Sequence, residues 1–586
     1  MKKNKIDLPE TITASRTDPI YNCHSYLTKV PIEAIKPFIE QFTEPGEIVA
    51  DFFAGSGMTG LAALSLGRKA RMSDISVLGQ HIALGYLQNV SEHKFRAAAD
   101  LVIKIARDAI GDFYETERIS DGAIQEMTRT VWSFTYLCPA CGNEMVYFEH
   151  IDANGKAPAT CPSCTETFVK RKWVRGGDVP VRVVVIGEEG KLVEQPIRDF
   201  DIKKIDAAAR DKRLKDIPSQ PIESHREMYS RSGLGKAGMT NTGQFFSSRN
   251  GIALLELWRA INGVDDERIR RKLRFAFTAI LPRASKRYQW GPKRPLNAQN
   301  QTYYIAPVYY EWNIFELFAR KVNATVRASD ELFGSASLFT DGEHDVTYDL
   351  LSADSLSHLE DGSVDYVFTD PPFGSNIFYS DMNLFHEAWL NRVTDYRSEA
   401  VVHTTGRQKS GAEERYENLL RGSFEEAWRI LKPGKYLSVV FGNSRGDIWG
   451  VVQRALRQAG FYHAPIHVAI LDKGQRSVKG LNSGSESVVT VDLVVTLQKP
   501  LSEEGSIGLA IEPTDTDKTL LIREAIRELS TNGAANPSHV YARILRKAIQ
   551  KHMVLDNLHL TDVLIALRNA GYVIDHKTGK IISRVS

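Results

Sequence analysis

The sequence is poor in cysteine and has no long apolar run. Only five cysteines occur among 586 residues. Four of them form two CxxC pairs, which fits a reducing compartment better than a disulfide framework. No apolar stretch approaches the roughly 20 residues that a membrane-spanning helix needs, and residues 1–7 lack the apolar core of a signal peptide. We therefore expect a cytoplasmic protein without a membrane partner.

The sequence also lacks repeats, long low-complexity tracts and a strong charge imbalance. Its formal net charge is +2, with 42% hydrophobic and 25% charged residues, which is ordinary for a globular enzyme. A balanced total can conceal a local basic stripe, so the net charge says little about partners. The length predicts roughly three or four domains.

Two stretches, residues 21–95 and 341–500, alternate between short apolar strands and amphipathic helices. The expected strands are residues 48–50, 70–73, 346–350, 364–369, 436–441, 467–471 and 487–497. This alternation predicts an α/β fold with a mostly parallel, doubly wound sheet. The last two strands are expected to form an antiparallel edge hairpin. Residues 96–340 interrupt the pattern and are predicted to be an insertion.

A glycine loop follows the first expected strand. Gly55, Gly57 and Gly60 form G-x-G-x-x-G before a helix, and glycine lets a backbone turn tightly and approach a ligand closely. Asp74, at the end of the second expected strand, is placed to accept hydrogen bonds from ribose hydroxyls. Taken alone, the loop fits a dinucleotide-binding oxidoreductase nearly as well, or a turn with tight helix packing.

A second motif, Asp370-Pro371-Pro372-Phe373, directly follows an apolar strand. Prolines donate no backbone hydrogen bond, so their carbonyls can act purely as acceptors. The Asp370 carboxylate and the Pro371 carbonyl can accept both N–H groups of an exocyclic amine, while Phe373 stacks on the base. The alternative is a proline-rich turn from strand to loop. Asn376 and Tyr379 could shape the same pocket, or could simply cap and pack the next helix.

With these two motifs, the sequence resembles the S-adenosylmethionine-dependent DNA amino-methyltransferases of bacteria and archaea. The resemblance covers residues 21–90 and 345–500 and implies a Rossmann-like sheet of seven strands. It implies that Asp74 holds the ribose of S-adenosylmethionine, that Asp354 contacts its adenine ring, and that a segment around Thr28 closes over it. The implied cofactor-binding residues are Thr28, Lys29, Asp51, Phe53, Ala54, Gly55, Gly57, Asp74 and Asp354.

The same resemblance implies a substrate. The D-P-P form is more similar to adenine-N6 than to cytosine-N4 enzymes, with Asp370, Pro371, Pro372 and Phe373 as the catalytic residues. Because a duplex buries this amino group, the adenine of double-stranded DNA would have to be flipped out. A restriction-modification or phage-defence setting, with partner proteins, is a further expectation. Two rivals are an RNA guanine-N2 methyltransferase and a non-catalytic zinc-ribbon DNA-binding protein.

Two features of the insertion have chemistry of their own. Cys138, Cys141, Cys161 and Cys164 have the spacing C-x2-C-x19-C-x2-C, which predicts a structural zinc ribbon within residues 131–175. A redox role for either pair is the alternative.

Residues 268–310 contain no acidic residue but many basic and aromatic ones. This mixture suits phosphate neutralisation and base stacking, although a solvated helix face followed by a packing loop would look similar. The predicted nucleic-acid contacts are Arg283, Lys286, Arg287, Tyr288, Trp290, Lys293 and Arg294.

A separate C-terminal domain is expected at residues 515–586. Helical patterns at 520–529, 540–549 and 560–570 precede a hairpin-like end at 572–582. Three helices and a hairpin are compatible with a DNA-binding winged helix. A small domain that only covers the sheet fits equally well.

Overall fold

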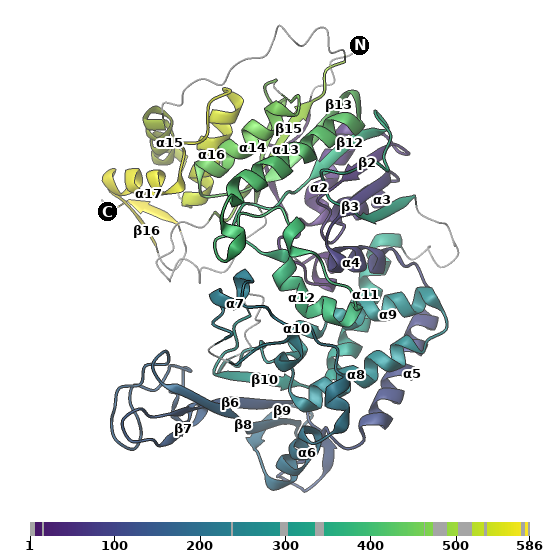
Figure 1. Ribbon diagram of the computed structural model, residues 1–586, viewed down its shortest axis with the longest axis vertical. Coiled ribbons are helices and arrows are strands. Elements are labelled where there is room, and N and C mark those ends of the chain that lie inside the picture. Colours follow the sequence, from purple (N-terminus) through teal and green to yellow (C-terminus); the bar gives the residue numbers. More distant parts are fainter. Residues whose placement is uncertain are drawn as a thin grey trace.

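The computed structural model describes residues 6–14, 17–235, 238–293, 303–334, 345–461, 463–472, 489–501, 518–532, 536–575 and 580–583. The main sheet lies in one half of the elongated molecule, with the C-terminal helices beside it. The insertion makes up the other half (Figure 1). Within the described ranges, no helix is long and apolar enough to cross a membrane.

The main sheet joins the two α/β stretches of the sequence. Its order is β1-β14-β15-β13-β12-β2-β3-β11. The bounds are β1 Thr11–Thr13, β14 His467–Asp472, β15 Asp492–Gln498, β13 Leu431–Phe441, β12 Val364–Thr369, β2 Ile48–Asp51, β3 Lys69–Asp74 and β11 Val346–Leu350. Only β15 is antiparallel to its neighbours, and the other neighbouring strands are parallel. The expected α/β sheet is confirmed.

The edge of this sheet differs from the expectation. The described residues form eight strands instead of seven, because β1 pairs in parallel with β14. β1 has only three residues, too few for periodicity to reveal it. The late strands do pair with each other, but β15 lies between β13 and β14 and so is not at the edge. It also begins at Asp492 rather than 487, and residues 487 and 488 lie outside the described ranges.

Both faces of the main sheet are covered by helices. Val49, Tyr366 and Phe368 belong to the apolar cluster that contains α2 (Ile32–Phe42) and α3 (Met58–Ser65). Ala50 and Val367, one position along the same strands, belong to the cluster of α13 (Ala412–Ile430) and α14 (Gly446–Gln458). Successive side chains on a strand point to opposite faces. Burial on both faces therefore explains why these strands are continuously apolar.

The insertion is built on a second, antiparallel sheet with the order β10-β6-β8-β9. Its strands are β6 Arg129–Leu137, β8 Val174–Ile186, β9 Leu192–Pro196 and β10 Val308–Trp312, and β7 Glu144–Val146 pairs with β6. The long helices are α5 Glu92–Ile110, α8 Ser248–Asn262, α9 Glu267–Thr278 and α11 Ile314–Phe333. The ends of β6 and β8 carry β7 outward as an arm (Figure 1).

The remaining elements are short or connect these parts. They are α1 Pro19–Cys23, α4 Val77–Leu87, β4 Glu115–Glu117, β5 Ile124–Glu126, α6 Asp199–Ala209, α7 Glu227–Arg231, α10 Leu281–Ala284 and α12 Tyr379–Leu390.

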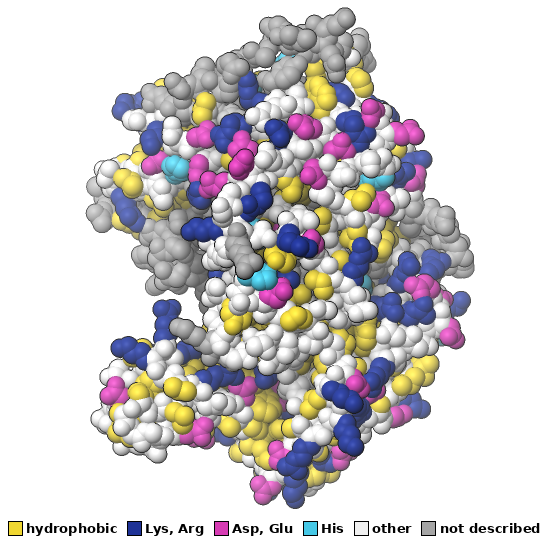
Figure 2. Space-filling model, viewed as in Figure 1, with side chains coloured by type: hydrophobic (Ala, Val, Ile, Leu, Met, Phe, Trp, Pro, Cys, Tyr) yellow, Lys and Arg dark blue, Asp and Glu magenta, His cyan; other side chains and the backbone are white. Residues whose placement is uncertain are grey.

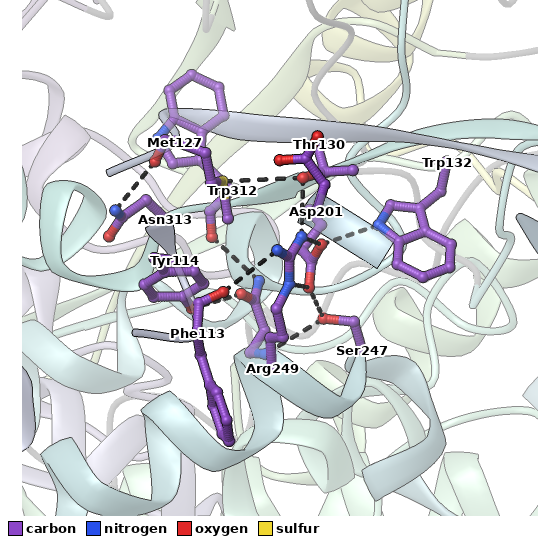
Figure 3. A network of polar contacts seen from close by, with 12 residues as sticks. Phe113, Tyr114, Met127, Thr130, Trp132, Asp201, Ser247, Arg249, Trp312 and Asn313 are labelled. Carbon is purple, nitrogen blue, oxygen red and sulfur yellow. Dashed lines mark hydrogen bonds and ion pairs between the residues drawn. The ribbon is translucent and has the colours of Figure 1, made fainter. Parts of the chain in front are cut away.

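A buried ion pair joins the elements of the insertion. Arg249 of α8 and Glu311 of β10 are 3% and 1% exposed, so each charge depends on the other for compensation. Glu311 also accepts a hydrogen bond from the Trp132 indole (2.9 Å), and Arg249 donates one to the Thr130 hydroxyl (2.8 Å). Figure 3 shows Arg249 of α8 close to Thr130 and Trp132 of β6. The network holds the base of the arm against the helices.

The C-terminal residues form three helices and a hairpin. They are α15 Lys518–Asn532, α16 Pro537–Gln550, α17 Leu560–Asn569, β16 Tyr572–Ile574 and β17 Ile581–Ser583, the last two being antiparallel. Val540, Ile544 and Leu567 share one apolar cluster with α14 and the main sheet. The Arg546 guanidinium also donates to the Val468 carbonyl of β14 (2.8 Å). These elements therefore pack directly on the half that holds the main sheet.

Candidate active site

A cavity lies where β2, β3 and β12 end. These strands are neighbours in the sheet and run in parallel, so the loops at their carboxyl ends meet at one edge, where open α/β sheets bind ligands. The lining residues include Thr28, Lys29, Asp51, Phe53, Ala54, Gly55, Asp74, Asp370 and Pro372. The structure thus brings together two motifs that are more than 300 residues apart.

A direct hydrogen bond connects the two motifs. The Thr369 hydroxyl, one residue before Asp370, donates to Asp51 Oδ1 at 2.8 Å. The buried Asp51 carboxylate also accepts from the Thr59 hydroxyl (2.7 Å) and the Phe53 amide (3.1 Å). Burial raises the pKa of Asp51 to about 6, against the opposing effect of these hydrogen bonds. Asp51 acts as a brace between β2 and β12.

The glycine loop has the backbone geometry that its sequence requires. Gly55 and Gly57 have φ values of +49° and +79°, which side chains rarely permit. A Cβ on Gly60 would lie 2.3 Å from the Met72 sulfur, so this glycine lets α3 pack closely on β3. Asp74 accepts hydrogen bonds from the amides of Gly55 (2.8 Å) and Ser76 (2.9 Å). Asp74, predicted to bind the ribose, therefore also holds the glycine loop in place.

The main chain of the Asp370–Phe373 motif is held from two sides. The Tyr416 hydroxyl of α13 donates to the Pro372 carbonyl (2.7 Å), and the Asn443 amide donates to the Phe373 carbonyl (3.0 Å). The Phe373 ring packs edge-to-face on Phe441, with centroids 4.9 Å apart. Asp370 faces the cavity. The motif is therefore a rigid loop whose carboxylate borders the cavity.

The segment around Thr28 covers the cavity. The Tyr26 ring stacks on Tyr379 at 6.2 Å, and its hydroxyl donates to the Ser76 hydroxyl at 3.2 Å. The Thr28 and Tyr379 hydroxyls are 2.7 Å apart. Thr28 has a φ of +58°, a conformation unusual for a β-branched residue. The segment thus connects the start of α4 to the start of α12.

Two predicted cofactor contacts, Lys29 and Asp354, do not point a free polar group into the cavity in an obvious way: one is held by main-chain carbonyls and the other is exposed beside a lining residue. The Lys29 ammonium donates to the carbonyls of Tyr21 (2.9 Å) and His24 (3.0 Å), and burial lowers its pKa to about 7. Its charged end is therefore engaged by the residues of α1 and the position after it. Asp354 is exposed and lies just beyond Ala353, which lines the cavity.

Sequence reasoning missed one lining carboxyl, Glu399. It accepts hydrogen bonds from the Tyr379 amide and the Ser380 hydroxyl. Burial raises its pKa to about 8, so this side chain is mostly neutral at pH 7. Glu399 lies in a loop without any motif. Nothing in the sequence places it at the cavity.

The four paired cysteines come together in the arm. Their sulfurs all lie within 4.8 Å of one another. Cys138 and Cys164 are 3.6 Å apart, and Cys141 and Cys161 are 3.8 Å apart. Four thiolates about 2.3 Å from a tetrahedral zinc ion would have this separation. The cluster could therefore hold a metal ion, and its donor set suits zinc.

Several side chains of the basic segment, residues 268–310, are buried instead of lying on the surface. Arg287 and Tyr288 are only 4% and 7% exposed, so both are buried in this structure, and their contact with nucleic acid stays a prediction. Lys286 forms an ion pair with Asp178 of β8 (3.1 Å), and Trp290 packs edge-to-face on Phe148. Tertiary packing supplies the acidic partner that the local sequence lacks.

Two other residues of that prediction, Arg283 and Lys293, are exposed, and Arg294 lies outside the described residues. Arg283 borders a second cavity of about 550 Å³, together with Arg320, Lys321 and Arg327.

Comparisons with known proteins agree with this geometry at the start of the chain. Residues 3–112, which include the glycine loop, match the family model described as "DNA methylase". "Putative methylase YubD" of Escherichia coli (strain K12) is 47% identical over 58 residues, which are 10% of this chain and 25% of that protein. The chain thus spans a quarter of the curated relative.

A crystal structure from Thermus thermophilus, described as a putative DNA modification methylase, is 17% identical. The matched region is 30% of this chain and 60% of the Thermus thermophilus chain, and the TM-score is 0.15. The likeness to the DNA methylase family model thus covers the part of the chain that carries the glycine loop.

Proposed function

We propose that this protein transfers a methyl group from S-adenosylmethionine to the N6 amino group of adenine in DNA. One observation carries the proposal. The Thr369–Asp51 hydrogen bond places the Asp370–Phe373 motif beside the glycine loop, at a cavity that both line. A nucleoside-binding loop alone would fit many enzymes. A carboxylate and two prolines at the same cavity fit an acceptor amine.

The residues present fit the proposed cofactor. Gly55 and Tyr26 both line the cavity, and a Cβ on Gly55 would lie 3.0 Å from the Tyr26 ring, so the close packing at this point requires glycine. Asp74 stands at the end of the neighbouring strand, as ribose recognition requires. Phe53, Ala54 and Gly55 would hold the methionine end, and Asp354 the adenine ring. The cofactor supplies a methyl group that its sulfonium already activates, so no covalent enzyme intermediate is needed.

The chain itself would position the acceptor. The Asp370 carboxylate and the Pro371 carbonyl would accept the two N–H groups of the amine, which turns the nitrogen lone pair toward the methyl donor. Phe373 would replace the stacking lost when the base is flipped out of the duplex. Tyr416, Asn443 and Phe441 keep this loop rigid. Catalysis would then come chiefly from orientation and exclusion of water.

Other parts of the molecule have proposed roles in this reaction. The cysteine cluster would hold structural zinc. Arg283 and Lys293 remain candidates for DNA contacts because they are exposed. The C-terminal helices and hairpin retain the winged-helix interpretation. A cytoplasmic restriction-modification or phage-defence role, with a partner nuclease, would give such methylation a purpose.

The proposal is tested by methyl incorporation from labelled S-adenosylmethionine. We expect label in adenine N6 of duplex DNA, and less in cytosine or RNA. Asp370→Ala should lower incorporation at least about 100-fold, because it removes an acceptor that orients the amine, while cofactor affinity measured by calorimetry stays unchanged. Glu360→Ala, which alters an exposed carboxylate before β12, is the control and should keep full activity. Equal activity of Asp370→Ala and wild type would refute the catalytic role.

A further inference from the structure

One turn of the zinc-binding arm exposes three consecutive basic side chains. Lys170, Arg171 and Lys172 follow the second cysteine pair and are all exposed. We call residues 169–174 the ribbon turn. It runs into β8, which begins at Val174, and it closes on itself, because the amides of Lys172 and Trp173 both donate to the Val169 carbonyl (2.8 and 3.2 Å).

The ribbon turn is rigidly supported from below. Phe168 and Trp173, on either side of the basic residues, are 9% and 5% exposed and pack edge-to-face at 5.0 Å. Phe168 also packs edge-to-face on Tyr136 of β6 (5.2 Å). The Trp173 indole donates to the Thr167 carbonyl (3.2 Å). The basic side chains therefore point outward from a scaffold that loses little entropy when they bind.

These charges are not neutralised within the described part of the chain. No acidic side chain there forms an ion pair with Lys170, Arg171 or Lys172. On α9, by contrast, Arg271 pairs with Glu267. The Lys170 ammonium instead lies 4.7 Å above the centroid of the Tyr304 ring and donates to its hydroxyl. Three adjacent exposed cations, one of them over an aromatic ring, favour a partner that carries phosphates.

Apolar side chains around the turn are exposed as well. Val169, Val174 and Tyr304 are 38%, 65% and 36% exposed. Exposed apolar side chains next to unpaired cations resemble a binding surface, where they would pack on sugars while the cations reach phosphates.

The position of the arm fits a long, linear partner. The arm projects sideways from the insertion half (Figure 1), and basic side chains lie along its upper edge in Figure 2. The 13 residues of β8 span about 40 Å at roughly 3.3 Å each. One turn of B-DNA measures about 34 Å. The ribbon turn thus stands about 40 Å, roughly one turn of a duplex, from the inner end of β8.

We infer that the ribbon turn binds the sugar–phosphate backbone of duplex DNA about one helical turn from the target base. The inference rests on the proposed function, since it names where the remote part of that substrate is held. The contact is independent of base sequence, because Lys170, Arg171 and Lys172 would meet phosphates. Its purpose would be to anchor the duplex while the target base is in the cavity.

The test is the salt dependence of duplex binding by the triple variant K170Q/R171Q/K172Q. Each phosphate contact contributes about 0.9 to the slope of log K against log salt. We expect the variant's slope to be shallower by roughly 2 to 3, with a raised KM for DNA and an unchanged kcat. Zinc content and cofactor affinity should match wild type, which excludes an unfolded arm.

Two matched variants sharpen the result. K203Q/K212Q/K215Q removes three exposed charges elsewhere in the insertion and should leave the slope near wild type. K170R/R171K/K172R keeps the charge and should keep the slope. A slope unaltered in the Gln variant, or lowered equally in the control, overturns the inference. Ribbon-dependent binding without methyl transfer would instead refute the proposed function, and a wild type that binds no duplex would overturn both.

Discussion

At the scale of single residues, the site depends on one threonine hydroxyl. Thr369 is fully buried and is one of three groups that donate to the Asp51 carboxylate. Its side chain contacts no expected substrate atom, yet it joins the strand before Asp370 to the strand before the glycine loop. If a buried carboxylate loses a hydrogen-bond donor, the cost of removing it from water is no longer compensated, and the folded state is destabilised.

We therefore predict that Thr369→Val lowers the free energy of unfolding by about 1–3 kcal/mol and reduces methyl transfer. Urea unfolding and labelled methyl incorporation measure the two effects. Thr369→Ser restores the hydroxyl and should recover most of both. If the Val and Ser variants lose stability and activity equally, the loss comes from packing, and the Thr369–Asp51 hydrogen bond does not contribute to function.

At the scale of elements, the arm should depend on metal and the main sheet should not. The four sulfurs lie at the end of β6 and in the loops that lead to β8, and the rings of Phe168 and Trp173 pack beside them. Structural zinc contributes folding energy directly. The main sheet has its own clusters of apolar residues on both faces.

Removal of zinc, by a chelator or by Cys164→Ser, is predicted to raise hydrogen exchange across residues 138–173. Exchange in β2, β3 and β12 should stay as it is. Mass spectrometry gives both readings from one sample, and metal analysis should find one zinc per chain. Cys23→Ala, at the buried cysteine of α1, is the control and should retain the metal. Equal exchange with and without metal would contradict a structural zinc site.

At the scale of the whole molecule, buried polar contacts fasten the insertion to the wall of the cavity. The Glu227 carboxylate of α7 accepts from the amides of Thr404 (2.6 Å) and Thr405 (2.7 Å). Nearby, Arg226 pairs with Asp381 of α12 at 2.9 Å, with both side chains buried. Tyr379 and Ser380, at the start of α12, line the cavity. The position of the insertion is thereby coupled to the shape of the site.

We predict that Glu227→Ala lowers kcat/KM for DNA about 10- to 100-fold, because a shift of about 1 Å in substrate position is enough for such a loss. Affinity for S-adenosylmethionine, whose expected contacts lie on the other strands, should change less than about 2-fold. Steady-state kinetics and calorimetry separate these quantities. The exposed neighbour Glu223→Ala is the control. An equal loss of cofactor affinity would point to general unfolding.

The sequence alone determined the features that arise from local chemistry. The glycine loop at Gly55 and Gly57 could be predicted, because only glycine adopts these backbone angles readily. Asp370–Phe373 is readable because two prolines remove backbone donors at fixed positions, and the cysteine spacing reflects the geometry of a metal knuckle. The apolar strands of the main sheet could also be predicted, since burial on both faces needs continuous apolar runs.

Only the tertiary structure decided which residues meet. The Asp51–Thr369 hydrogen bond and the place of Glu399 at the cavity depend on contacts between distant segments, which no local pattern records. Arg287 shows the same in reverse: its basic neighbourhood predicted a surface, but aromatic side chains from elsewhere bury it. Conformational preference is a property of neighbours along the chain. Burial and charge compensation are properties of neighbours in space.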